Sequence, residues 1–137
     1  MGAEHRFEEH TGEVRLVLSA STLEELFAEA GRALAELTLG ELPASSTPGP
    51  EQRIAVRGRD RAALLVEWLN ELIFRSETTK QVFTRLRVDR VGANEMQAAV
   101  AGVSPEGLRT QVKAATLHGL SLENRGGAWQ ASVVLDV

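Results

Sequence analysis

The sequence predicts an α+β fold, in which two helices pack on one face of a mostly antiparallel β-sheet and form a single-domain two-layer sandwich. Apolar residues recur with the 3.6-residue period of a helix in two stretches and alternate with a period of two elsewhere. Hairpin-forming strands beside amphipathic helices are typical of this class. Because 137 residues suffice for one core and are few for two, we expect one domain over residues 1–137.

The densest apolar run, Leu64–Phe74, predicts the helix around which the rest of the chain is organised. At 100° per residue its apolar side chains cover an arc of roughly 200°, which is wider than the stripe of an ordinary surface helix. We therefore expect this helix to be mostly buried, with Asp60 as its N-cap and its end near Ser76. Glu67 and Asn70 lie on the remaining polar face, which we interpret as solvent-exposed.

A capping box predicts the start of the other helix. Ser21 and Glu24 have the spacing at which the serine hydroxyl accepts from the backbone N–H of Glu24 and the carboxylate reaches back to the N–H of Ser21. From Leu23 to Leu37, apolar residues then recur at intervals of three and four. We expect one apolar face along this helix.

Alternating residues predict strands on both sides of these helices, in the order β-β-α-β-α-β-β-β-β. The expected strands are Glu4–Glu8, Val14–Ala20, Arg53–Arg57, Val82–Val91, Met96–Val100, Arg109–Glu123 and Trp129–Val137. The stretch from Arg109 is a long strand or a bent pair, broken near His118 and Gly119. Prolines and small polar residues predict an exposed loop at about residues 40–52.

The composition narrows the possible functions. The absence of cysteine excludes disulfides, thiolate metal sites and thiol nucleophiles. The formal net charge is −4 and the positive residues are scattered along the chain, so we expect no strong direct binding of nucleic acid, although a local basic patch can still assemble in three dimensions. Because there is no signal-peptide h-region and no run of about 20 apolar residues, we expect a cytoplasmic protein without membrane contact.

The first candidate site is rich in oxygen ligands. Glu9, His10 and Glu13 crowd one turn near the start, whereas Asp136 and the terminal carboxylate of Val137 lie at the other end of the sequence. If the last strand pairs near the first, these groups converge as ligands for a hard cation, because calcium and magnesium prefer carboxylate and carbonyl oxygens. The alternative is that Glu13 and Asp136 are solvated residues at strand ends.

The second candidate is His118, which precedes Gly119 in the middle of a predicted strand. A glycine there indicates a bulge or the close approach of a ligand or another backbone. His118 is either a general base or a hydrogen-bonded structural histidine. The chain has no nucleophile elbow, no P-loop, no dinucleotide-type glycine pattern and no His-x-x-x-His pair, so the sequence offers no self-sufficient catalytic motif.

Four segments resemble the archease family and occur in the family's order over almost the whole chain. They are Glu9–Glu13, Leu65–Leu72, Lys113–Leu120 and Trp129–Val137. The helical segment and the C-terminal segment are each fairly specific.

The resemblance implies a small α+β protein that is not itself an enzyme. It would assist the GTP-dependent RNA ligase that joins 2′,3′-cyclic phosphate or 3′-phosphate ends to 5′-hydroxyl ends in tRNA splicing and RNA repair. The family's protein is expected to speed formation of the ligase's covalent histidine-guanylate and so to allow many turnovers.

The resemblance also implies a bound divalent cation, often calcium, whose ligands fall on Glu13, Asp136 and Val137. His10, His118, Glu67 and Asn70 are then candidates for contacts around these ligands or with the ligase.

The chain departs from the family in the turn His10–Glu13, where the family has His-Thr-Ala-Asp. The glutamate keeps an oxygen ligand but adds a methylene, which moves the carboxylate by more than about 1 Å; the flexible calcium shell tolerates this better than the strict magnesium octahedron. The alternative function is a metal-dependent hydrolase, in which Glu13 and Asp136 hold the cation and His10 or His118 activates water.

Overall fold

The computed structural model describes residues 2–41 and 47–137 and has the predicted order of helices and strands. Its elements are β1 (Glu4–His10), β2 (Glu13–Ala20), α1 (Leu23–Leu39), β3 (Gln52–Arg57), α2 (Arg61–Thr79), β4 (Val82–Val91), β5 (Glu95–Val103), β6 (Ala114–Arg125) and β7 (Ala128–Asp136). Part of the predicted exposed loop, residues 42–46, lies outside the described residues. None of the helices in the described part of the chain is long and apolar enough to cross a membrane.

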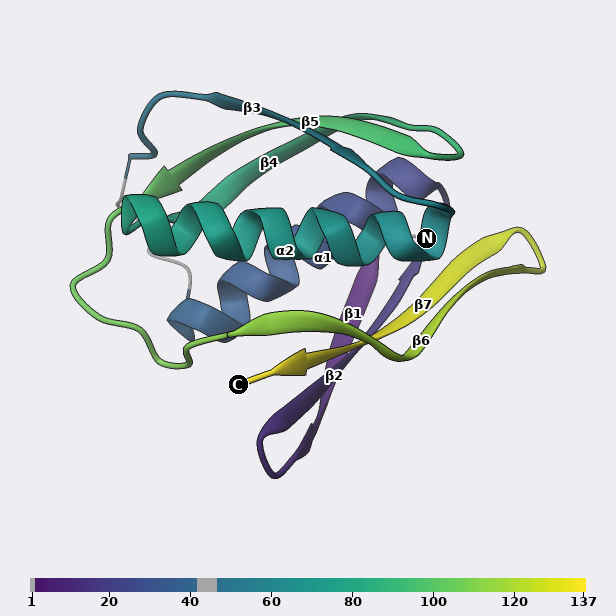
Figure 1. Cartoon of the computed structure of the whole chain (residues 1–137), viewed down its shortest axis with the longest axis horizontal. Helices are drawn as coiled ribbons and strands as arrows, with labels where there is room; N and C mark the ends of the chain where they lie inside the picture. Colours follow the sequence, from purple (N-terminus) through teal and green to yellow (C-terminus); the bar gives the residue numbers. More distant parts are fainter. Residues whose placement is uncertain (1, 42–46) are drawn as a thin grey trace.

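The predicted α+β class with antiparallel strands is confirmed, but the strands form two sheets where we expected one. The four-stranded sheet has the order β1-β2-β7-β6, and the three-stranded sheet has the order β3-β5-β4. Both helices contact strands of both sheets and lie between them (Figure 1). The physical reason is the width of the apolar surface on the helices: α1 is buried on most sides, and one sheet covers a helix from one side only.

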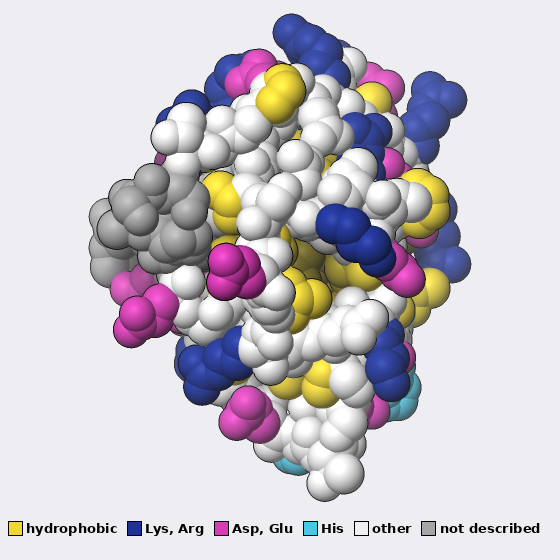
Figure 2. Space-filling model, turned by 90° about the vertical axis from the view of Figure 1, so that its left-hand side faces the viewer, with side chains coloured by type: hydrophobic (Ala, Val, Ile, Leu, Met, Phe, Trp, Pro, Cys, Tyr) yellow, Lys and Arg dark blue, Asp and Glu magenta, His cyan; other side chains and the backbone are white. Residues whose placement is uncertain are grey.

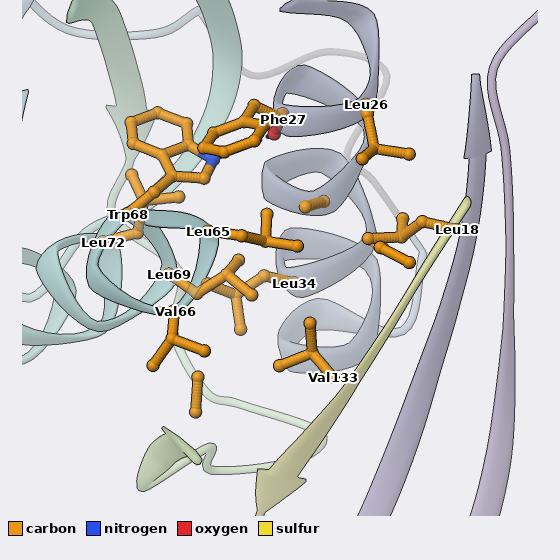
Figure 3. Close-up of a cluster of buried hydrophobic side chains, with 14 of the residues drawn as sticks. Leu18, Leu26, Phe27, Leu34, Leu65, Val66, Trp68, Leu69, Leu72 and Val133 are labelled. Carbon is orange, nitrogen blue, oxygen red and sulfur yellow. Dashed lines mark hydrogen bonds between the residues drawn. The ribbon is translucent and has the colours of Figure 1, made fainter. Parts of the chain in front are cut away.

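A single core joins the two helices and the two sheets. Leu65 and Leu69 of α2 point toward α1, while Val133 of β7 approaches from the four-stranded sheet (Figure 3). The indole N–H of Trp68 donates to the carbonyl oxygen of Phe27 at 2.8 Å, so the largest buried side chain also satisfies its polar atom. The prediction that Leu64–Phe74 marks a mostly buried helix is confirmed.

The N-cap of one helix is the predicted residue, whereas the N-cap of the other lies one residue away from the prediction. Asp60 is the N-cap of α2, as predicted, and accepts from the N–H of Ala63 at 2.8 Å. The capping box of α1 was predicted one residue too early, because Thr22 is the N-cap and its hydroxyl accepts from the N–H of Glu25 at 3.1 Å. The Glu24 carboxylate accepts from the N–H of Val91 at 3.1 Å, which ties α1 to the end of β4.

The predicted break near His118 and Gly119 is present as a bulge in β6. Thr116 pairs with Val134 and Ser121 with Ser132, so four residues of β6 lie opposite a single residue of β7. Gly119 has a φ of 68°, a backbone conformation that favours glycine. The strand itself begins at Ala114, five residues later than predicted, because residues 104–113 form an irregular connection.

Candidate functional site

Strand pairing brings the two ends of the sequence together at one end of the four-stranded sheet. Glu13 of β2 lies opposite Asp136 of β7, His10 of β1 lies opposite Glu13, and Ala114 of β6 lies opposite Asp136. These four residues form one transverse row across the sheet, which we call the terminal row. The pairing on which the sequence hypothesis depended, between the last strand and the start of the chain, is therefore present.

The side chains of the terminal row point away from the core. Val14 and Leu135, the next pair along β2 and β7, are buried in the core, so alternation directs Glu13 and Asp136 to the opposite face. Glu13 is exposed and Asp136 is half-buried. Directly opposed residues have Cβ atoms about 4.5–5.5 Å apart, close enough for two carboxylates to share one cation.

Backbone hydrogen bonds hold the last residues beside the first turn. The N–H of Val137 donates to the carbonyl oxygen of Gly12 at 3.1 Å, and the N–H of Lys113 donates to that of Asp136 at 2.8 Å. Gly12 has a φ of 75°, a conformation that an alanine rarely adopts. The glycine that departs from the family's turn thus suits the turn that this chain makes.

The oxygen ligands at this end of the sheet are of the type that a hard cation binds. Among residues 2–41 and 47–137, no group of three or more His, Cys, Asp or Glu side chains is arranged to hold a metal ion. The terminal row nevertheless offers two side-chain carboxylates, and the terminal carboxylate of Val137 follows directly after Asp136. Oxygen donors of this type fit calcium, and since calcium takes six to eight ligands, further positions would need water, backbone carbonyls or a partner.

The structure does not bring the remaining candidate residues into the terminal row. His118 is exposed in the bulge of β6, and the paired residue Thr116 lies between it and Ala114. Glu67 is exposed on α2, as predicted. The predicted role of His118 and Glu67 in contacts with a cation or a partner stays a prediction.

Asn70 has a structural role that its place on the polar helix face did not indicate. Its Nδ2 donates to the carbonyl oxygen of Ala115 at 3.0 Å, and its Oδ1 accepts from the N–H of the same residue at 2.8 Å. β6 is an edge strand, so the side chain of Asn70 supplies the hydrogen bonds that a neighbouring strand would supply. Asn70 thereby holds the strand that ends the terminal row.

A feature that the sequence did not indicate lies on the three-stranded sheet. Arginines that are scattered along the chain gather on its outer face, and no local pattern marks them, because their common position depends on the pairing of β3 and β4 with β5.

Comparison with known proteins extends the resemblance to the whole chain. Residues 5–137 match the model of the Archease protein family (MTH1598/TM1083). "Protein archease" of Methanosarcina mazei is 28% identical over 99% of this chain and 97% of its own length. The protein of the same name from Methanopyrus kandleri is 33% identical, with coverage of 94% and 96%.

Two solved structures have the same fold. Protein 1598 of Methanobacterium thermoautotrophicum has a TM-score of 0.75 at 26% identity, with 99% of both chains covered. A Thermotoga maritima protein, described as an archease and possible chaperone, has a TM-score of 0.64 at 24% identity, with 98% of both chains covered. The two-sheet arrangement is thus common to these relatives and this chain.

Proposed function

Because the chain belongs to the archease family, we propose that it is a non-enzymatic activator of the GTP-dependent RNA ligase that joins 3′-phosphate or 2′,3′-cyclic phosphate ends to 5′-hydroxyl ends. It would act in the cytoplasm, in tRNA splicing and RNA repair, by promoting guanylylation of the ligase histidine. The full-length family match carries this proposal, and the description of one relative as a possible chaperone is consistent with a protein partner.

The proposed mechanism is differential binding. A partner changes the conformation of an enzyme only if it binds one state more tightly than the other, so the protein would favour the ligase state that is competent for guanylylation. The exposed carboxylates of the terminal row, Glu13 and Asp136, would act near the metal and nucleotide site of the ligase. They can carry a cation to that site or complete its coordination.

The cation that we propose is calcium, held by Glu13, Asp136 and the terminal carboxylate of Val137. A ligand that binds only the folded chain raises the melting temperature as its concentration rises. We expect this rise with calcium, and we expect Glu13→Gln and Asp136→Asn to abolish it. Glu123→Gln is the matched control, because Glu123 is exposed on the same sheet and lies at the far end of β6. An equal calcium shift in all variants would place the cation elsewhere.

A turnover assay tests the activation itself. RNA is supplied in large excess over the cognate ligase, and this protein in less than stoichiometric amount. We expect it to convert single-turnover ligation into multiple turnover, and we expect Asp136→Ala to reduce the effect at least about tenfold, as loss of metal-site groups commonly does. If guanylylation rate and turnover are the same with and without the wild-type protein, the proposed activation is wrong.

The alternative, a metal-dependent hydrolase, has one observation in its favour, which is the position of His10 opposite Glu13. The imidazole would then activate a water on a cation held by Glu13 and Asp136. Hydrolysis of a phosphoester by the protein alone, lost in both His10→Ala and Asp136→Ala, would support this function over the activator.

A further inference from the structure

The outer face of the three-stranded sheet is lined with arginines. Ile54 on β3, Leu86 on β4 and Ala98 on β5 face the core, so alternation turns their neighbours outward. The arginines on this outer face are Arg53, Arg57, Arg85, Arg87 and Arg90. Among the described helices and strands none covers this face, which forms the upper edge of the molecule in Figure 1. We call it the arginine face.

The arginine stems cover the middle strand while their charged ends reach solvent. Arg53 and Arg87 flank Ala99, and Arg85 lies beside Ala101. The two alanines are only 1% and 3% exposed although they point outward, as expected when long side chains lie over them. The side chain of Arg87 is 54% exposed, and basic side chains stand out along the top of Figure 2. The guanidinium groups are therefore available to a ligand.

The arginine face is the positive part of an acidic protein. Arg87 contacts Asp89 at 2.8 Å and Glu51 at 3.2 Å, and Arg90 contacts Glu95 at 3.4 Å. Five arginines and three carboxylates give this face a formal charge of +2, whereas the whole chain has −4, so the rest carries −6.

Three of the arginines, Arg53, Arg57 and Arg85, form no salt bridge with any residue in the described part of the chain. Such separation of charge concentrates the attraction for anions at one face.

A hollow of about 680 Å³ lies at one end of the arginine face, lined by Arg57, Arg90, Glu95 and the turn between β4 and β5. Asn94 in this turn donates to the carbonyl oxygens of Gly58 at 3.2 Å and Arg59 at 2.9 Å. These hydrogen bonds tie the turn to the segment before α2 and fix one wall of the hollow. A phosphate group seated there would lie between Arg57, which has no salt bridge in the described part of the chain, and Arg90, which it would share with the carboxylate of Glu95.

We propose that the arginine face binds a single-stranded polynucleotide through its phosphates, with one nucleotide in the hollow between Arg57 and Arg90. Arg57 pairs with Glu95 and Arg85 lies beside Ala101, so the positive strip extends about 20 Å along β5 at about 3.4 Å per residue. A row of cations of this length matches the repeated charges of a flexible strand, and guanidinium planes also stack on unpaired bases.

The composition of the arginine face favours a polynucleotide over an acidic protein surface. Protein interfaces are anchored by buried aromatic or large apolar side chains, whereas the apolar groups between these arginines are the alanines Ala55, Ala99 and Ala101. The inference goes beyond the activator function, because it concerns the other sheet and requires no ligase.

Fluorescence anisotropy with a labelled oligouridine of about 12 nucleotides tests the proposal on the isolated protein. We expect saturable binding. Contacts with about three phosphates give a slope of log K against log salt near −2, so that binding weakens about 16-fold between roughly 50 and 200 mM salt. Absence of saturable binding at the lower salt, or binding that does not respond to salt, would overturn the proposal.

Two triple variants with the same change of charge locate the site. Arg53→Gln/Arg57→Gln/Arg85→Gln should weaken binding about tenfold or more, whereas Arg6→Gln/Arg109→Gln/Arg125→Gln should change it by less than about twofold. Circular dichroism checks that both variants are folded. Equal weakening by the two variants would show attraction by net charge alone and would overturn the proposal.

A variant that is expected to bind more tightly provides a second test, because unfolding of the variant would not increase its affinity. Glu51→Gln/Asp89→Asn frees Arg87 from its two carboxylates, and we expect tighter binding of the oligouridine with a steeper salt dependence. Unchanged or weaker binding in this variant contradicts the proposal. Loss of ligase activation without loss of oligouridine binding would refute the activator function alone, so the two inferences fail separately.

Discussion

Glu29 is the most buried charged residue in the described part of the chain, with 8% of its surface exposed. Its carboxylate lies 2.6 Å from Nδ1 of His5 and accepts from Arg32 at 2.8 Å, while Nε2 of His5 lies 2.7 Å from the carboxylate of Glu36. Burial raises the pKa of Glu29, but the hydrogen bonds from His5 and Arg32 outweigh it and hold this pKa below its ordinary value of 4.5. The cluster connects the edge strand β1 to α1.

We therefore predict that Glu29 stabilises the fold at neutral pH and that this contribution is lost in acid. Its pKa is lower in the folded chain than in the unfolded chain, so the unfolded chain binds the proton more readily. The contribution is complete above the ordinary pKa of 4.5 and disappears as the pH falls through the lower, folded value. Urea unfolding of the wild type and Glu29→Gln should show a difference that is large near pH 7 and shrinks progressively as the pH falls below 4.5.

Glu36→Gln is the control for this prediction, because the side chain of Glu36 is 46% exposed and makes only one of the contacts to His5. We expect a smaller effect from it at neutral pH, since solvent screens an exposed ion pair. A difference between the wild type and Glu29→Gln that stays constant from neutral to acid pH would contradict the proposed linkage.

At the scale of elements, the side chain of Asn70 adds a pair of hydrogen bonds to the packing of α2 against β6. The amide of Asn70 occupies the place of a neighbouring strand beside Ala115, and Ala114, the preceding residue, ends the terminal row. Without it, one N–H and one C=O of a partly buried strand edge lose their partners. A residue of the helix therefore helps to hold β6 beside Asp136, together with the pairing of β6 with β7.

Asn70→Ala should lower the free energy of unfolding by about 1–3 kcal/mol, because it leaves two backbone groups unpaired. It should also speed hydrogen exchange at the N–H of Ala115, which is a local signature that a general loss of stability does not give. Glu67→Ala, on the exposed face of the same helix, should stay within about 0.5 kcal/mol of the wild type. Unchanged exchange at Ala115 would refute this role of Asn70.

The sequence predicted the helices and strands better than it predicted which strands pair with one another. Period and turn signals are local, so the order of two helices and seven strands and the bulge near Gly119 were all readable. The N-cap of α1 was placed one residue too early, at Ser21 and not at Thr22, and the contact of Glu24 with the N–H of Val91 joins residues that are distant in sequence. The division into two sheets also depends on long-range pairing.

The same limit applies to the candidate sites. The terminal row could be proposed because Glu13 and Asp136 are marked by their places at the two ends of the sequence, although only the pairing of β2 with β7 joins them. The residues of the arginine face have no comparable position in the sequence that would identify them. Arg53 and Arg87 become neighbours across Ala99 only because β5 lies between β3 and β4.

At the scale of the whole molecule, the two sheets share one hydrophobic core. Neither sheet is therefore expected to unfold separately from the other. Leu16 of the four-stranded sheet and Ile54 of the three-stranded sheet belong to the same buried cluster, with α1 and α2 between the sheets. We expect a single cooperative unfolding transition, as small domains with one core usually show. Far-UV circular dichroism and the fluorescence of Trp68, measured in a Trp129→Phe background, should give coincident curves.

Core substitutions in each sheet make this prediction decisive. Leu16→Ala and Ile54→Ala should each cost about 2–5 kcal/mol, and each should shift both probes by the same amount, since Trp68 lies in the core that the sheets share. Gln97→Ala, exposed on the outer face of the three-stranded sheet, should shift neither probe by more than about 0.5 kcal/mol. If Ile54→Ala instead separates an early transition from a late one, the three-stranded sheet unfolds on its own. The helices would then be stabilised mainly by the sheet that carries the terminal row.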